Sequence, residues 1–285
     1  MTFVTASNVD HADNAEMATA AAYLLAGEPR EIERLRTIAR AFEPAGQALL
    51  DRLGPGEGLR ALDVGCGPMG WLRPLSRWVG PRGSVVGTDI QPGILEAAGS
   101  FVAAGTLSNV VLLLDDLFDS GLPPSSFDLV HARFELAPLG RAAEQMAAYL
   151  RLCKPGAWLV LEEPASASWQ FHPSAPAAER LIHLIIKAFA DGGGDFDAGR
   201  SLPDIFRRHV GVEPAILGEV LALPPGDPFL RQPLAFAAAL RLRLTELMAG
   251  SQLDRLVSAA GDELRQPLRW GTSFTLIQAY SRVPA

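Results

Sequence analysis

Short apolar segments alternate with segments of helical periodicity over residues 59–164, and this alternation restricts the possible folds more than any other feature. The apolar segments are LRALDVG (59–65), GSVVGTDI (83–90), NVVLLLDD (109–116), SFDLVHARFEL (126–136) and AWLVLEEP (157–164). Helical segments lie between them at residues 71–80, 91–106 and 141–153. Strands that alternate with helices at this spacing form parallel βαβ units. We therefore predict an α/β fold built on a doubly wound, Rossmann-like sheet.

The segments outside this alternation divide the chain further. Residues 1–53 are interpreted as an N-terminal helical arm, with one helix in EPREIERLRTIARAF and another short helix ending at a Gly-Pro-Gly break. Residues 54–164 are expected to form the ligand-binding core, and residues 165–205 a helical lid insertion. Residues 206–285 return to the core, with a strand near 214–224, a terminal strand near 272–282 and a helical insertion at about 230–265.

The charge balance argues against a nucleic-acid partner, because 25 basic and 32 acidic residues give a net charge of −7 without a dominant basic cluster. The two cysteines and five histidines show no metal-ligand spacing, so no metal site is expected. No apolar run reaches the roughly 18 residues that span a bilayer. The first residues lack the basic start and apolar segment of a secretory signal. We expect a cytoplasmic protein with no membrane partner.

A glycine-rich turn, G-x-G-x-x-G, follows the first predicted strand and consists of Gly65, Gly67 and Gly70. In a doubly wound sheet such a turn lets the backbone approach a nucleotide-like ligand. The pattern alone fits several cofactors, including NAD. Asp63 is poorly placed beside a pyrophosphate, and Pro68 lacks the N–H that a phosphate cradle would use. The loop therefore favours a cationic ligand, such as an amino group or a sulfonium.

Acidic residues end the next two predicted strands. Asp89 is placed to accept hydrogen bonds from two ribose hydroxyls, which NAD and S-adenosylmethionine both carry. Asp115 and Asp116 follow the third strand, where an adenine amino group could be recognised. One of this pair could instead cap a turn.

Five motifs, in this order, resemble those of class I S-adenosylmethionine-dependent methyltransferases. They are ALDVGCGPMG, VVGTDI, VLLLDDL, FDLVHARFEL and YLRLCKPGAWLVLEEP. The resemblance runs from about residue 20 to the C-terminus. The arm at 23–54 is similar to that of bacterial small-molecule methyltransferases of secondary metabolism and, more distantly, of quinone C-methyltransferases. The resemblance implies a seven-stranded sheet whose last strand is antiparallel, with S-adenosylmethionine as cofactor and S-adenosylhomocysteine as product.

The resemblance also implies a set of cofactor-binding residues. Tyr23 would close over the cofactor. The methionine end would be lined by Asp63, Gly65 and Gly67, with Arg133 and Phe134 beside it. The ribose would be bound by Asp89 and the adenine flanked by Asp116 and Leu117, and the set is completed by Cys66, Ile90 and Asp115. The chain departs from the family pattern at Met69, where a third glycine is usual. It also lacks the histidine that relatives commonly carry a few residues beyond HARF.

Two residues are candidates for catalysis. His131 ends the fourth predicted strand, near the expected methyl group, and is the candidate general base. Glu162 and Glu163 end the fifth strand at the same edge of the sheet. Glu163 is taken as the second catalytic candidate, although one of the two acids is expected to be solvated or to cap a turn.

These observations predict methyl transfer from S-adenosylmethionine to a small, apolar or aromatic metabolite in natural-product biosynthesis. The insertions around 170–205 and 230–265 contain the apolar runs LIHLIIKAFA and PLAFAAAL, which are expected to shape an acceptor pocket. One alternative is a cofactor-binding protein on the same fold that does not methylate, or a cyclase. Another is an NAD-dependent oxidoreductase. A homodimer formed through the N-terminal arm is a further hypothesis.

Overall fold

A seven-stranded sheet forms the centre of the computed structural model, which describes residues 29–284. Its strands are β1 (Arg60–Val64), β2 (Ser84–Asp89), β3 (Val110–Leu114), β4 (Phe127–Arg133), β5 (Cys153–Ala165), β7 (Ala215–Glu219) and β10 (Thr275–Arg282). They lie in the order β3-β2-β1-β4-β5-β10-β7, and β10 runs antiparallel to both of its neighbours. The predicted doubly wound sheet with an antiparallel last strand is confirmed.

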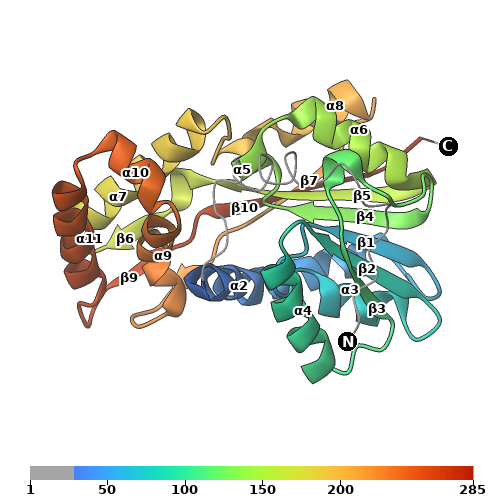
Figure 1. Cartoon of the computed structure of the whole chain (residues 1–285), viewed down its shortest axis with the longest axis horizontal. Coiled ribbons are helices and arrows are strands. Elements are labelled where there is room, and N and C mark those ends of the chain that lie inside the picture. The colour runs from blue at the N-terminus through green and yellow to red at the C-terminus, as the bar shows by residue number, and fades with distance from the viewer. Residues whose placement is uncertain (1–28, 285) are drawn as a thin grey trace, which may run out of the picture.

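Helices cover both faces of this sheet (Figure 1). On one face lie α3 (Leu72–Val79) and α4 (Pro92–Ala104), with α2 (Pro29–Leu53) packed against α3. On the other face lie α6 (Ala142–Leu152) and α8 (Leu202–His209). Strand β1 is buried at four of its five positions, as expected for a central strand with a helical layer on each side. The carboxyl ends of β1, β2 and β4 consequently meet at one edge of the sheet.

The helix α2 is a single helix of 25 residues, which corrects the prediction of two separate helices in residues 28–53. Pro44 lies inside it. A proline there removes one backbone hydrogen bond, and the sequence pattern therefore indicated a break. Burial of Ile38, Phe42, Leu49 and Leu50 on both sides of Pro44 holds the helix against the rest of the protein.

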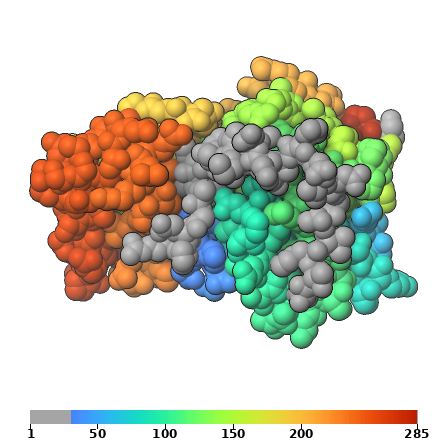
Figure 2. Space-filling model, viewed as in Figure 1, coloured from blue at the N-terminus to red at the C-terminus, as the bar shows by residue number. Residues whose placement is uncertain are grey.

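A helical lobe lies beside the sheet layers, and Figures 1 and 2 show it at one end of the molecule in yellow, orange and red. It contains α7 (Pro176–Asp191), α9 (Gln232–Ala239), α10 (Arg241–Leu247) and α11 (Gly250–Leu264). Helix α7 contacts the other three, and α9 contacts α2. The two predicted helical insertions therefore pack together, although they are separated by β7 in the chain.

A three-stranded sheet in this lobe was not predicted. Its strands are β6 (Gln170–His172), β9 (Trp270–Thr272) and β8 (Ala222–Leu223), in that order. The single strand expected near 214–224 is divided between β7, in the main sheet, and β8, in the small one. The short helices are η1 (Leu117–Asp119), α5 (Leu136–Leu139), η2 (Ser166–Ser168), η3 (Ala198–Ser201) and η4 (Pro228–Arg231). Within residues 29–284, no helix combines the length and apolar content needed to cross a membrane.

Candidate active site

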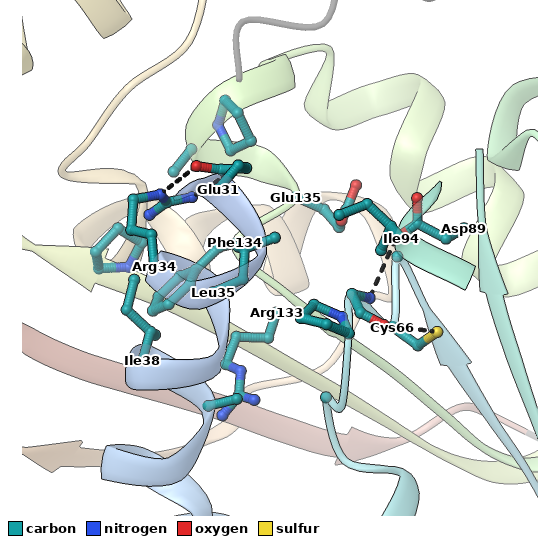
Figure 3. Close-up of a pocket in the computed structure, with 18 of the residues that line it drawn as sticks. Glu31, Arg34, Leu35, Ile38, Cys66, Asp89, Ile94, Arg133, Phe134 and Glu135 are labelled. Atoms are coloured by element: carbon teal, nitrogen blue, oxygen red, sulfur yellow. Dashed lines mark hydrogen bonds and ion pairs between the residues drawn. The ribbon is translucent and has the colours of Figure 1, made fainter. Parts of the chain in front are cut away.

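A pocket of about 930 Å³, including its part open to solvent, lies where the glycine-rich turn, α2 and the helical lobe meet (Figure 3). We call one part the polar half; it is lined by Asp63, Gly65, Cys66, Gly67, Pro68, Gly70, Asp89, Gln91, Ile94, His131, Arg133 and Glu135. We call the other part the aromatic half; it is lined by Phe134, Phe189, Phe196, Phe236 and Phe274, with Glu31, Arg34, Leu35 and Ile38 of α2.

The glycine-rich turn is shaped by two close contacts. Gly70 has a φ of +34°, and a Cβ atom there would overlap Asp63 Oδ2 and the carbonyl oxygen of Cys66. A glycine is therefore required at position 70. Met69 is only 2% exposed, and its carbonyl accepts a hydrogen bond from Leu72 N at 3.2 Å. The residue that departs from the family pattern is thus part of the core.

Asp89 lies at the carboxyl end of β2 and holds the turn against this strand. Its Oδ2 accepts a hydrogen bond from Gly67 N at 3.1 Å, and its Oδ1 accepts one from Gln91 N at 3.0 Å. Burial raises the pKa of Asp89 to about 6, although both backbone donors oppose the shift. Each oxygen keeps a lone pair that can accept from a ligand hydroxyl.

His131 lies beneath the polar half and is fully buried between two carboxylates. Its Nδ1 is 2.7 Å from Asp63 Oδ1, and its Nε2 is 3.1 Å from Glu162 Oε2. The ring also stacks on Trp71, with centroids 3.9 Å apart. Burial lowers the pKa of His131, but the two carboxylates outweigh it and raise the pKa overall. A doubly protonated ring satisfies both carboxylates and has no lone pair for a substrate proton, so this geometry argues against the predicted role as a base.

The same network connects four strands with Trp71, the residue that precedes α3. Glu162 also accepts a hydrogen bond from Gln278 Nε2 at 2.5 Å and lies 3.6 Å from Arg133 Nη1. Asp63 accepts a hydrogen bond from Trp71 N at 2.8 Å through its second oxygen. Asp63 lines the pocket but is only 1% exposed, and this burial argues against its predicted direct contact with a ligand.

Glu163 caps the short helix α5. Its Oε1 accepts from the backbone N–H groups of Glu135 and Leu136 at 3.0 and 2.8 Å, and its Oε2 accepts from Ala137 N at 3.0 Å. Burial raises its pKa to about 8. The side chain is 1% exposed and absent from the pocket lining within residues 29–284. This arrangement argues for a structural cap in place of the predicted catalytic role.

Comparisons with known proteins identify the family. A model described as "Methyltransferase domain" matches residues 61–156. The chain is 33% identical to the nocamycin O-methyltransferase of Saccharothrix syringae over 195 residues, which is 64% of this chain and 69% of that protein. The chain belongs to the class I S-adenosylmethionine-dependent methyltransferases.

Two further similarities agree with this membership. The aklanonic acid methyltransferase of Streptomyces sp. strain C5 is 34% identical over 141 residues, which is 50% of this chain and 64% of that enzyme. An S-adenosylmethionine-dependent methyltransferase from Aquifex aeolicus shares the fold, with a TM-score of 0.54 at 17% identity, 90% coverage of this chain and complete coverage of that one. The alternative of an NAD-dependent oxidoreductase receives no support from these relatives.

The structure brings together seven of the residues expected to bind the methyltransferase cofactor. They are Asp63, Gly65, Cys66, Gly67, Asp89, Arg133 and Phe134, all in the pocket lining. Burial and nearby carboxylates raise the pKa of the Cys66 thiol well above its usual value, so it stays neutral. Tyr23 lies outside the described residues.

Four other expected residues do not line the pocket formed by residues 29–284: Ile90, Asp115, Asp116 and Leu117. Asp116 Oδ1 accepts from Phe118 N at 2.9 Å and caps η1. Asp115 Oδ1 accepts from Gly121 N at 3.0 Å. The alternative that one acid of this pair caps a turn therefore describes Asp116, and Asp115 holds the loop that follows η1.

The sequence did not single out two sets of charged residues in the pocket. The first is Glu135, whose signal was its spacing: two residues beyond Arg133, it follows the end of the same strand. The second is the buried ion pair of Glu31 and Arg34, in which Arg34 Nε donates to Glu31 Oε2 at 2.7 Å. Their i,i+3 spacing on a helix was visible, but their position in a pocket was not. No group of three or more metal-binding side chains occurs in the described part of the chain.

Proposed function

We propose that the protein transfers a methyl group from S-adenosylmethionine to a small, apolar or aromatic metabolite in natural-product biosynthesis. One observation carries this proposal: a polar half of nucleotide-binding character continues directly into an aromatic half. Phe134 connects the two, because it follows β4 in the polar half and its ring meets Phe274 edge-on, with centroids 5.7 Å apart.

The polar half fits the cofactor that the family uses. Asp89 is a half-buried carboxylate at the end of β2, where the ribose hydroxyls of an adenosine would be bound. Arg133 is 7% exposed, and its Nη1 is buried without a hydrogen-bond partner among the described residues. A buried guanidinium nitrogen that has an acidic neighbour but no hydrogen-bond partner can donate to a ligand carboxylate. When bound, S-adenosylmethionine supplies an electrophilic methyl group on a sulfonium.

The aromatic half supports an apolar acceptor. Phe196 stands at its centre, with its ring centroid 5.2 Å from that of Phe189, 5.7 Å from Phe236 and 5.5 Å from Phe274. Such walls bind flat apolar molecules and exclude water. Arg34 lies over Phe236, with its guanidinium carbon 4.2 Å from the ring centroid, and adds a polar group to this surface.

The chain's contribution to the reaction is mainly alignment. Holding two reactants in line contributes roughly 7–11 kcal/mol in well-oriented systems. The network of Asp63, His131 and Glu162 fixes the ends of β1, β4 and β5, from which the pocket residues project. These residues therefore position the site without exchanging a proton with the acceptor.

The names of the relatives support the substrate class. The two bacterial enzymes reported above act, by their names, on nocamycin and aklanonic acid. We propose a small metabolite as the acceptor here, with no nucleic-acid or membrane partner, and a cytoplasmic location. A homodimer formed through the N-terminal arm stays a prediction, which sedimentation velocity of the whole protein would check.

Incubation with methyl-labelled S-adenosylmethionine and a panel of aromatic and polyketide-like acceptors tests the proposal. We expect label in at least one acceptor and stoichiometric S-adenosylhomocysteine, with Asp89→Ala as the inactive control. Binding of S-adenosylhomocysteine without label transfer to any acceptor would instead favour the alternative of a protein that does not methylate, or a cyclase.

A further inference from the structure

We propose that Glu135 is the counter-charge for the α-ammonium group at the methionine end of S-adenosylmethionine, the end at which the resemblance placed Asp63. This inference rests on the proposed function, because it concerns the same cofactor. It names the residue that distinguishes a cofactor with an intact amino acid from an adenosine that lacks one.

The first observation is the position of the Glu135 carboxylate. It lies directly over the first glycine of the turn, where a Cβ atom on Gly65 would overlap Glu135 Oε1. Gly65 has a φ of +58° and no side chain, so its backbone and the carboxylate face the same space in the pocket. Figure 3 shows Glu135 beside Asp89 and Ile94, on the side of the pocket away from α2.

The second observation is that this charge is uncompensated. The Glu135 carboxylate makes no hydrogen bond or ion pair with any of the residues that the structure describes, whereas Asp63, Glu162 and Glu163 each have partners on both oxygens. The neighbouring charges that act on Glu135 are Asp89, Glu163 and Asp63. Burial and these three acids raise its pKa well above the usual value. A cation bound beside Glu135 would stabilise its ionised form and offset both the burial and the repulsion from these acids.

The third observation is the opposite charge two residues earlier. The Arg133 side chain is 7% exposed, and its Nη1 has no hydrogen-bond partner within residues 29–284, although it lies 3.6 Å from Glu162 Oε2. Phe134, between Arg133 and Glu135, has a φ of +59°, which turns the chain at the end of β4. The pocket therefore presents a cation and an anion from one short segment. An α-amino acid carries a carboxylate and an ammonium on one carbon, and this pairing assigns the ammonium, in preference to the sulfonium, to Glu135.

Titration calorimetry with Glu135→Gln tests the assignment. S-adenosylhomocysteine retains the α-ammonium group and lacks the sulfonium, whereas 5′-methylthioadenosine lacks the whole amino acid. We expect the variant to bind S-adenosylhomocysteine about 10- to 100-fold more weakly than the wild type, as for loss of a hydrogen bond to a charged group. Affinity for 5′-methylthioadenosine should change less than about twofold, which also shows that the variant is folded.

Two control variants complete the experiment. Glu144→Gln, an exposed residue of α6 paired with Arg141, should leave both affinities unchanged. Glu135→Asp, which keeps the charge, should restore part of the affinity. Unchanged binding of S-adenosylhomocysteine to Glu135→Gln, or equal weakening of both ligands, would overturn the assignment. A much larger loss for S-adenosylmethionine than for S-adenosylhomocysteine would overturn it in favour of the sulfonium. Failure of the wild-type protein to bind either adenosine would overturn the proposed function itself.

Discussion

The two halves of the pocket are held together by different physical means. The polar half is held by a buried network of charged side chains and by hydrogen bonds from backbone N–H groups to carboxylates. Asp89 and Glu163 each accept such bonds. The aromatic half is held by ring contacts among five phenylalanines, with centroid distances of 5.2–6.1 Å along its walls.

The two kinds of contact lead to different specificities for the cofactor and for the acceptor. Hydrogen bonds and ion pairs have strict geometry, so the polar half should tolerate few changes in its ligand. Contacts between rings and apolar molecules are less directional, so the aromatic half can be altered to accept other molecules without loss of the cofactor.

The largest expected effect is on stability, through His131. In His131→Ala, the carboxylates of Asp63 and Glu162 lose the group between them and stay buried. We expect the free energy of unfolding in urea to fall by about 3–5 kcal/mol. His183→Ala, an exposed residue of α7, should change it by less than about 0.5 kcal/mol. Equal stability of the two variants would contradict the account of the network.

The next effect concerns the cofactor. Asp89→Ala removes the acceptor for two backbone donors and for the proposed ribose hydroxyls, and we expect S-adenosylhomocysteine to bind about 100-fold more weakly. Asp116→Ala, which loses only the cap of η1, should change the affinity less than about threefold. Titration calorimetry measures both. A larger loss of affinity in Asp116→Ala would indicate that Asp116 contacts the adenine, as the sequence suggested.

A dependence on pH follows from the pKa of Asp89, which burial raises to about 6. The carboxylate accepts hydroxyl hydrogen bonds when it is ionised, so affinity for S-adenosylhomocysteine should fall by about tenfold per pH unit below pH 6. Asp89→Asn should remove the contribution of this residue to the pH dependence of binding.

The same raised pKa affects folding stability in the opposite direction. Protonated Asp89 stabilises the unliganded protein most at low pH, and this contribution is lost as the pH rises through 6. Identical pH profiles for the wild type and Asp89→Asn would contradict the assignment.

The smallest expected effect lies in the aromatic half. Phe236→Leu keeps an apolar side chain but removes the ring that Arg34 covers. We expect KM for the acceptor to rise about three- to tenfold, while the affinity for S-adenosylhomocysteine stays within about twofold. Steady-state kinetics and calorimetry separate these quantities. A parallel loss of both would mean that the two halves are not independent.

The same contrast explains what could be predicted from the sequence. Gly65, Gly67 and Asp89 follow successive strands, so local patterns were enough to bring them to one edge of the sheet. The contacts of His131 were not visible, because they depend on strand order: Asp63 is its direct neighbour in the pairing of β1 with β4, and Glu162 comes from β5 on the other side. Histidine at a strand end therefore suggested a base, although its neighbours leave it no free nitrogen.

The aromatic half was predicted as an apolar pocket but not by its residues. Phe134 and Phe274 lie at opposite ends of the segment that supplies its rings, and only the tertiary packing of α7 and α9 brings the others between them. The strands β6, β8 and β9 are three residues or shorter, too short for an alternating pattern to be recognised. The helix break predicted near Pro44 was wrong because burial of the helix on both sides of Pro44 outweighs the local preference of proline for a break.

The central claim, that the polar half is built for S-adenosylmethionine and not for a dinucleotide, is tested most directly by titrating the wild-type protein with S-adenosylhomocysteine and with NADH. We expect one binding site per chain for S-adenosylhomocysteine and no detectable binding of NADH under the same conditions. Binding of NADH without binding of S-adenosylhomocysteine would contradict it.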